Sequence, residues 1–269
     1  MHHDFDAAIR LAPIGEHRFT GATSPAYANM VGPFGGTTCA TLLNAAMLHP
    51  QRQGEPIAMT VNFAGPVADG AFEIEARPVR TNRSTQHWSL HLLQQGIVAT
   101  TATAVFAQRR DTWSVQEAMA PQDMPPAVAL ARAPVLGRPA WVQRYDMRFA
   151  EGEMPGSFDN EEQPHSNSRL WVRDEPPRLL DFASLAAISD CFFPRIFIRR
   201  RMLTPIGTVS LTIFFHADSS LLAEQADRYV LGSARALNYR NGYFDQSAEI
   251  WSDSGRLLAS THQIVYFRE

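Results

Sequence analysis

The final stretch of the chain, Leu258-Ala-Ser-Thr-His-Gln-Ile-Val-Tyr266, repeats the pattern of an earlier stretch, Val98-Ala-Thr-Thr-Ala-Thr-Ala-Val-Phe106. The two copies lie about 160 residues apart, which is too far for a solenoid repeat and suits a duplicated domain. Upstream of them, Met59-Thr-Val-Asn-Phe63 is echoed by Val209-Ser-Leu-Thr-Ile-Phe-Phe215. The sequence therefore predicts one fold that occurs twice in the chain.

Each copy has the pattern of one helix followed by antiparallel strands. In the first copy, apolar residues at helical spacing predict a helix over residues 37–48. In the second copy we expect the corresponding helix over residues 179–193, ended by Pro194. Strands are expected at residues 17–20, 57–63, 71–80, 86–93 and 98–108, and again at 141–149, 169–173, 208–216, 229–239, 243–251 and 256–268. This order gives an α+β fold class.

The segment between the two copies has a different composition. Residues 109–139 contain several prolines scattered among Ala, Gln and Asp, which is typical of a linker. We therefore divide the chain into a first domain at residues 1–108, a linker at 109–139, and a second domain at 140–269.

Composition narrows the classes of function. The formal net charge of −3 gives no field to attract nucleic acid or a membrane surface, so neither is expected as a partner. All of the basic residues are arginine, which excludes lysine Schiff-base chemistry and a lysine-based phosphate loop. Cys39 and Cys191 lie far apart in apolar stretches, and the start of the chain lacks the pattern of a signal peptide. We expect a cytoplasmic protein.

Asp190 is the most informative single residue, because it lies at the end of the expected second helix. The residues one and two turns before it are Ala183, Ala186 and Ala187. Such a face lets a sheet approach closely, and an acid there loses water, which raises its pKa and suits a general base near neutral pH. The alternative is a carboxylate that caps the helix or pairs with an arginine. In the first copy the neutral Asn44 lies at nearly the matching place, so only the second copy carries the acid.

Two strands of the second copy carry further polar candidates. Thr208, Ser210 and Thr212 alternate with aliphatic residues, so a regular strand would place the three hydroxyls on one face. Gln263 lies among apolar residues of the last strand, and the repeat aligns it with Thr103 of the first copy. A solvated strand face, or an amide that pairs with a backbone edge, explains these groups equally well.

Backbone groups at the start of the first helix are a separate candidate. Gly35-Gly36 lies at this start, where unpaired N–H groups can stabilise an anion or a developing oxyanion. His91, His216 and His262 lie in strands without metal-ligand spacing, so no metal site is expected.

The order and spacing of these motifs resemble the type II acyl-CoA thioesterases. That family has a double hot-dog fold, in which each half is an antiparallel sheet wrapped round a central helix. The resemblance covers nearly the whole chain. It is carried by Phe34-Gly-Gly36, Asn62-Phe63 with Pro66, Ser189-Asp190, residues 208–216, and Leu258-Ala-Ser-Thr-His-Gln263.

The resemblance implies a hydrolase of lipid metabolism that cleaves the thioester of an acyl-CoA substrate. The family's water-activating Asp, Thr and Gln fall on Asp190, Thr208 and Gln263, with no cofactor or metal. The resemblance also implies a homodimer formed through the sheets. Where the family commonly has Asp-His after the Thr, this chain has Ser210-Leu211, so Ser210 is an alternative to Thr208. The chain also lacks an Arg that the family often has near Gly242-Tyr243.

Two other functions stay open on the sequence alone. A non-catalytic acyl-CoA-binding hot-dog protein would keep the fold and lose turnover, and the departures from the family pattern are compatible with it. A hot-dog enoyl-CoA hydratase would need a His a few residues after the Asp, whereas Cys-Phe-Phe-Pro-Arg follows Asp190 here. The hydratase is therefore the weaker alternative.

Overall fold

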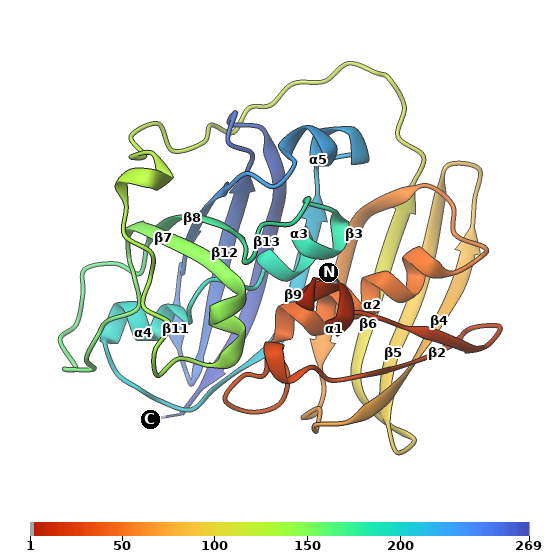
Figure 1. Ribbon diagram of the computed structural model, residues 1–269, viewed down its shortest axis with the longest axis horizontal. Helices are drawn as coiled ribbons and strands as arrows, with labels where there is room; N and C mark the ends of the chain where they lie inside the picture. The colour runs from red at the N-terminus through yellow and green to blue at the C-terminus, as the bar shows by residue number, and fades with distance from the viewer. Residues whose placement is uncertain (1–2, 269) are drawn as a thin grey trace.

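The computed structural model describes residues 3–268, whose strands join into one antiparallel sheet of 13 strands (Figure 1). The first half, on the right of Figure 1, has the strand order β1-β2-β4-β5-β6-β3. Its elements are α1 (Asp4–Ala8), β1 (Ala12–Gly15), β2 (Arg18–Ala22), α2 (Gly35–Leu48), β3 (Glu55–Phe63), β4 (Ala71–Thr81), β5 (Thr85–Gln94) and β6 (Ile97–Ala107).

The second half repeats this order as β7-β8-β10-β12-β13-β9, with the short β11 paired to β12. Its elements are β7 (Tyr145–Glu151), β8 (Ser168–Asp174), α3 (Phe182–Ile188), α4 (Arg195–Arg200), β9 (Ile206–Phe215), α5 (Ser219–Gln225), β10 (Val230–Arg235), β11 (Tyr239–Arg240), β12 (Tyr243–Trp251) and β13 (Leu257–Phe267). Both halves therefore have one connectivity, and the predicted α+β class with the double hot-dog arrangement is confirmed.

The two halves meet where β3 pairs with β9. Thr60 lies opposite Thr212 in this antiparallel pair, and their hydroxyl oxygens are 3.0 Å apart. The two sheets are thereby joined edge to edge, so neither half leaves this edge unpaired.

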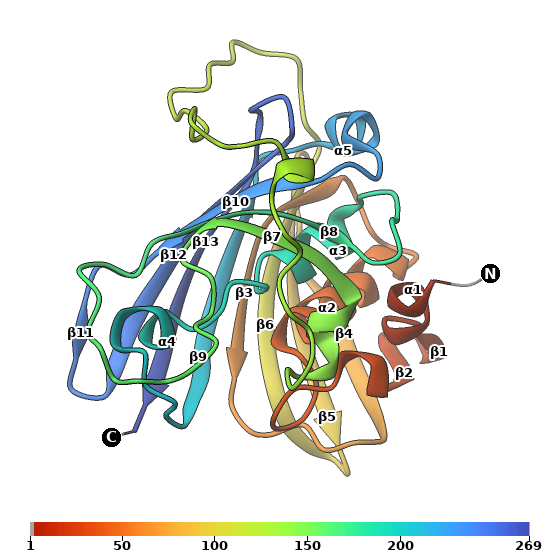
Figure 2. The same cartoon turned by 60° about the vertical axis from the view of Figure 1, so that its left-hand side comes forward.

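The sheet curves around two central helices, α2 and α3, which pack against each other (Figure 2). Most of α2 is buried and all of α3 is buried, as expected for helices that are apolar or small on every side. Small residues allow the close approach of the two helices. A Cβ added to Gly36 would lie only 2.4 Å from the carbonyl oxygen of Ala187.

The second helix is shorter than predicted, because α3 ends at Ile188 and not at residue 193. The N–H of Asp190 bonds to the carbonyl of Ala187 at 3.1 Å, and the N–H of Cys191 bonds to that of Ile188 at 3.0 Å. These contacts over three residues tighten the chain out of the α-helix. Asp190 therefore lies in the turn after α3, and a new helix, α4, begins after Pro194.

Most strands were predicted to within a few residues, whereas β1, β11, α1, α4 and α5 were not predicted. The segment that follows β6 crosses from the first half to the second at the top of Figure 1 and contains two short 3-10 helices, Ala127–Ala129 and Ala140–Arg144. The second of them occupies the start of the strand predicted at 141–149, so β7 begins only at Tyr145. Among residues 3–268, no helix is both long and apolar enough to cross a membrane.

Candidate active site

A small cavity of about 110 Å³ lies between the start of α2 and the strands β9, β12 and β13. Its walls are mainly aromatic and aliphatic, and residues of both halves contribute to them. The apolar lining includes Met30, Phe34, Trp141, Met154, Phe192, Phe193, Phe197 and Val265. Five polar side chains interrupt this lining, namely Asn29, Asp190, Thr208, Gln246 and Gln263. The structure thus brings the three residues of the predicted trio to one cavity.

Asp190 reaches the cavity from the turn after α3. Burial raises the pKa of its carboxyl group to about 7, although hydrogen bonds from Gln263 and from the backbone N–H of Gly36 favour the charged form. The amide Nε2 of Gln263 donates to Oδ1 of Asp190 at 2.8 Å. A carboxyl group with this pKa exchanges protons readily near neutral pH, which is the property that a general base needs.

The start of α2 holds the other side of Asp190. A Cβ added to Gly35 would lie 2.6 Å from Oδ2 of Asp190, so only glycine leaves room for the carboxylate. The positive end of α2 and the N–H of Gly36 stabilise the charged form of the acid. Of the two uses expected for the N–H groups at this helix start, the structure shows stabilisation of an anion, because the N–H of Gly36 faces the carboxylate of Asp190.

Thr208 enters the cavity because β9 contains a β-bulge. Ile264 of β13 pairs with Ser210, whereas the next residue, Val265, pairs with Thr208, so Val209 is an extra residue. A bulge shifts the alternation of side chains between the two faces of a strand. Thr208 lies 3.5 Å from Oε1 of Gln263, which is a long hydrogen bond.

The predicted face of three hydroxyls is consequently wrong. Ser210 and Thr212 lie on the face opposite to the buried Leu211, and Thr212 contacts Thr60 there. Thr208 is the residue of this row that lines the cavity, and Ser210 does not line it.

The structure also corrects two comparisons between the copies. Thr60 pairs with Thr103 in the first half and Thr212 pairs with His262 in the second, so Thr103 corresponds to His262 and not to Gln263. A slip of one residue moves a side chain to the other face of a sheet. The first-half counterpart of Gln263 is the buried Ala104, which has no polar group.

Asn44 is not part of the site. Its Nδ2 donates to the carbonyl of Ile9 at 2.9 Å, and it does not line the cavity. The first half contributes the start of α2 to Asp190, rather than the amide of Asn44.

Sequence reasoning missed Gln246, which lies directly opposite Gln263 in the β12–β13 pair. It is 2% exposed, and its Oε1 accepts a hydrogen bond from Nε of Arg195 at 3.1 Å. The signal was present in the sequence: Gln246 occupies an inward position of a strand whose other inward residues include Phe244 and Ala248. A polar residue at such a position needs a partner or a function.

Comparison with known proteins finds a family match for each half of the chain. Residues 24–107 match the family described as the acyl-CoA thioesterase N-terminal domain, and residues 116–267 match the acyl-CoA thioesterase C-terminal domain. No curated protein matches the chain in sequence.

Solved structures give the same fold. A conserved protein of unknown function with a hot-dog fold from Alicyclobacillus acidocaldarius is 47% identical, with a TM-score of 0.94 over 100% of this chain and 99% of that one. The acyl-CoA thioesterase II TesB2 of Mycobacterium marinum is 17% identical, with a TM-score of 0.79 over 98% of both chains. The second likeness bears on the fold alone. Because both halves match models of this family and the sheet is duplicated, the chain belongs to the acyl-CoA thioesterase family and has its double hot-dog fold.

Proposed function

We propose that the protein hydrolyses the thioester of an acyl-CoA by direct attack of water, with Asp190 as general base. The observation that carries this proposal is the hydrogen bond of 2.8 Å from Gln263 to Asp190 at the wall of an apolar cavity, with Thr208 beside them. An acid with a pKa of about 7 in such a place suits proton abstraction from water.

In this mechanism a water molecule lies between Asp190, Thr208 and Gln263. The carboxylate of Asp190 takes one proton, and the water oxygen forms a bond to the carbonyl carbon of the thioester. The C–S bond of the tetrahedral intermediate then breaks, and the sulfur leaves as the CoA thiolate, which accepts a proton. The products are a carboxylic acid and free CoA, and no covalent enzyme intermediate forms.

The shape of the cavity favours a short or aromatic acyl group. Its volume is about 110 Å³, and Phe34, Trp141 and Phe193 form a packed aromatic wall in which the Phe34 and Trp141 rings stack at 4.2 Å. A long chain would require the flexible side chains Met30 and Met154 to move.

Thiol release by the purified protein tests the proposal. Acyl-CoAs with short, long and aromatic acyl groups are supplied, and free CoA thiol is measured. We expect turnover, fastest with short or aromatic acyl groups. Binding of acyl-CoA without thiol release would instead support the non-catalytic binder. The observation that favours this alternative is the long Thr208–Gln263 contact of 3.5 Å, because such a contact holds the two side chains only weakly around a water. No His lines the cavity within the described residues, which counts against a hydratase.

We also propose the division into domains at 1–108 and 140–269, a cytoplasmic location, and a homodimer formed through the outer face of the sheet. Exposed apolar side chains on β9 and β13 support the dimer, since Phe214 is 47% and Tyr266 is 43% exposed. Sedimentation of the purified protein measures the oligomeric state.

A further inference from the structure

Arg195 is a buried cation whose hydrogen-bond acceptors are all neutral. The residue is 0% exposed, and burial lowers the pKa of its guanidinium to about 10, so it stays charged at neutral pH. Its Nη1 donates to Ser166 O at 2.8 Å and to Ser168 Oγ at 2.7 Å. Its Nε donates to Phe193 O at 3.0 Å and to Oε1 of Gln246 at 3.1 Å.

These contacts fix the orientation of the Gln246 amide. A guanidinium has donors only, so Gln246 must present its oxygen to Arg195 and turn its NH₂ group the other way. Within residues 3–268, Nε2 of Gln246 forms no hydrogen bond, although the side chain is 2% exposed and lines the cavity. An oriented donor with no partner therefore lies in the cavity beside Asp190 and Gln263.

We infer that Nε2 of Gln246 donates a hydrogen bond to the thioester carbonyl oxygen and to the oxyanion that develops from it. The inference rests on the proposed hydrolysis, which needs such a donor once the N–H of Gly36 is engaged by Asp190. Gln263 and Gln246 lie opposite each other on neighbouring strands. Gln263 acts on the attacking water through Asp190, whereas Gln246 donates to the carbonyl oxygen. The charge on Arg195 polarises the amide and strengthens the bond to an anion.

Replacement of Gln246 by Glu separates a catalytic role from a structural one. Glutamate keeps the shape, supplies an oxygen to Arg195 and gives this buried cation a partner, but it removes the N–H donor. We expect kcat to fall by about 100-fold, with KM within about threefold and thermal stability equal to or above that of the wild type. A purely structural Gln246 would keep its activity in this variant.

A second variant and a control complete the test. Gln246→Met removes the donor without adding a charge near Asp190, and we expect the same loss of kcat. Gln94→Glu makes the same change at a residue that binds the backbone of Ala68, and we expect wild-type kcat. If either folded Gln246 variant keeps wild-type kcat, the inference is wrong. Thiol release by the wild type tests the proposed hydrolysis separately, so that failure of the inference about Gln246 can be distinguished from failure of the proposed hydrolysis.

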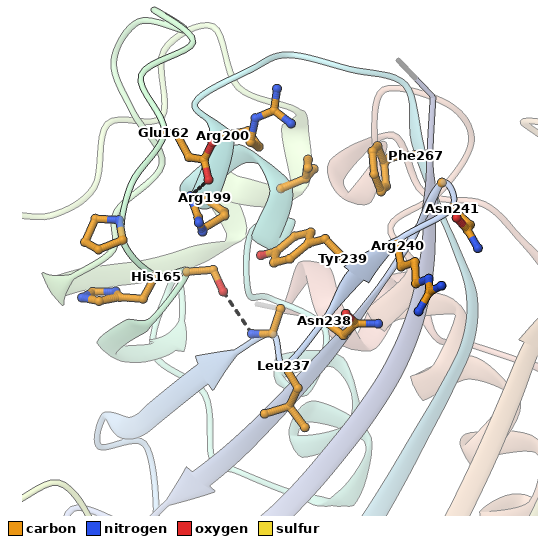
Figure 3. Close-up of a pocket in the computed structure, with 15 residues that line it drawn as sticks. Glu162, His165, Arg199, Arg200, Leu237, Asn238, Tyr239, Arg240, Asn241 and Phe267 are labelled. Carbon is orange, nitrogen blue, oxygen red and sulfur yellow. Dashed lines mark hydrogen bonds and ion pairs between the residues drawn. The ribbon is translucent and has the colours of Figure 1, made fainter.

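A second and independent observation is a larger groove of about 820 Å³ beside the cavity (Figure 3). Three arginines line it, together with the side-chain amides of Asn238 and Asn241 and the rings of Tyr239 and Phe267. The arginines are Arg199, Arg200 and Arg240. One acid, Glu162, lines it as well and pairs with Arg199 at 2.6 Å. The groove therefore has an excess of positive charge in a protein whose net charge is −3.

Arg240 is presented to the groove by a tight hairpin. Asn241 and Gly242 form its turn with φ angles of 53° and 77°, the conformation that joins two antiparallel strands most directly. Arg240 is exposed, and its guanidinium forms no hydrogen bond or ion pair with any residue in 3–268. A guanidinium without a partner, carried on a defined turn, suits recognition of a phosphate, which it can bind through two N–H groups.

The groove and the cavity share two structural elements. On α4, Phe197 lines the cavity while Arg199 lines the groove, and on β13, Val265 lines the cavity while Phe267 lines the groove. We propose that the groove binds the phosphates of the nucleotide end of CoA while the thioester lies in the cavity. This proposal also rests on the proposed hydrolysis of acyl-CoA.

Hydrolysis of acyl-CoA is compared with that of the same acyl group on pantetheine, which lacks the nucleotide. We expect Arg240→Ala to raise KM for acyl-CoA about tenfold with kcat unchanged, and to leave acyl-pantetheine hydrolysis as in the wild type. Arg83→Ala removes another exposed arginine, in the turn between β4 and β5, and should change neither substrate. The proposal is overturned if Arg240→Ala affects both thioesters equally or neither.

Calorimetry with adenosine 3′,5′-bisphosphate tests the groove without turnover. We expect the wild type to bind this nucleotide more tightly than Arg240→Ala does. Equal affinities would overturn the groove proposal, and they would leave the hydrolysis proposal to be judged by thiol release.

Discussion

The pKa of Asp190 sets the pH dependence of the proposed reaction. The base must be ionised, and burial raises its pKa to about 7, so the fraction of active enzyme increases as pH rises through this value. We expect kcat/KM to increase about tenfold per pH unit below 7 and to level off above it. Thiol release between pH 5 and 9 measures the profile. A flat profile, or an inflection near pH 4, would contradict the role of Asp190.

The same pKa makes stability depend on pH. Folding raises the pKa of Asp190 from its ordinary value of 3.8 to about 7, so the folded state favours the protonated acid. This stabilisation is fully present below pH 4 and is lost as pH rises through 7. Asn at this position does not titrate. Between pH 4 and 8 the free energy of unfolding of the wild type should therefore fall by up to about 4 kcal/mol relative to that of Asp190→Asn. The fall is smaller where water reaches the partly buried carboxyl group and screens its charge.

Urea denaturation of both proteins at pH 5 and pH 8 measures this difference. A gap between the two proteins that is the same at both pH values would show that Asp190 has an ordinary pKa in the folded state.

At the residue scale, the sequence predicted Asp190, Thr208 and Gln263, and the structure places all of them on one cavity. Gln246 was missed although its inward position in β12 is visible in the sequence, because the orientation of its amide depends on Arg195, which lies far from it in the sequence and next to it in space. No local pattern in the sequence reports such a tertiary contact.

At the scale of elements, the start of α2 determines where the carboxylate of Asp190 lies. A Cβ at Gly35 would be 2.6 Å from Oδ2 of Asp190. We expect Gly35→Ala to displace the acid and reduce kcat at least about tenfold, while alanine's helix propensity preserves α2. Thiol release and thermal unfolding measure the two effects. Gly65→Ala is the matched control, because nothing lies within 4 Å of its added Cβ. Unchanged kcat in Gly35→Ala would disprove this dependence.

Strand positions were predictable because buried and exposed residues alternate along them, as Trp88, Leu90 and Leu92 show in β5. The β-bulge at Val209 was not, because a bulge is defined by the register of the neighbouring strand. The prediction therefore placed Ser210 with Thr208, and the bulge separates them. The end of α3 was misjudged for a similar reason, since Cys191 and Phe192 are apolar but belong to the packed turn after the helix.

At the scale of the whole molecule, each half supplies what the other lacks. The second half carries Asp190, whereas the first supplies Gly36, which binds it, and Phe34, which lines its cavity. We expect residues 140–269 expressed alone to be inactive and prone to association through the unpaired edge of β9. Co-expression with residues 1–139 should restore thiol release through the β3–β9 pairing. An active isolated second half would contradict this division of roles.

The duplication was predictable from the sequence, and the sheet order confirms it. The alignment of the copies was one residue off, because similar sequences can be compared in several registers and only strand pairing selects one. The correction strengthens the asymmetry between the halves: Gln263 corresponds to an alanine in the first copy, so only one complete polar cluster is formed.

The most direct test of the account is the rate of thiol release by Asp190→Asn at pH 8, compared with the wild type on the same acyl-CoA. The variant keeps the size of the side chain and removes the base. We predict a kcat at least about 100-fold below that of the wild type, with an unchanged fold by circular dichroism. Release of thiol by the variant at the wild-type rate would contradict the assignment of Asp190 as the general base.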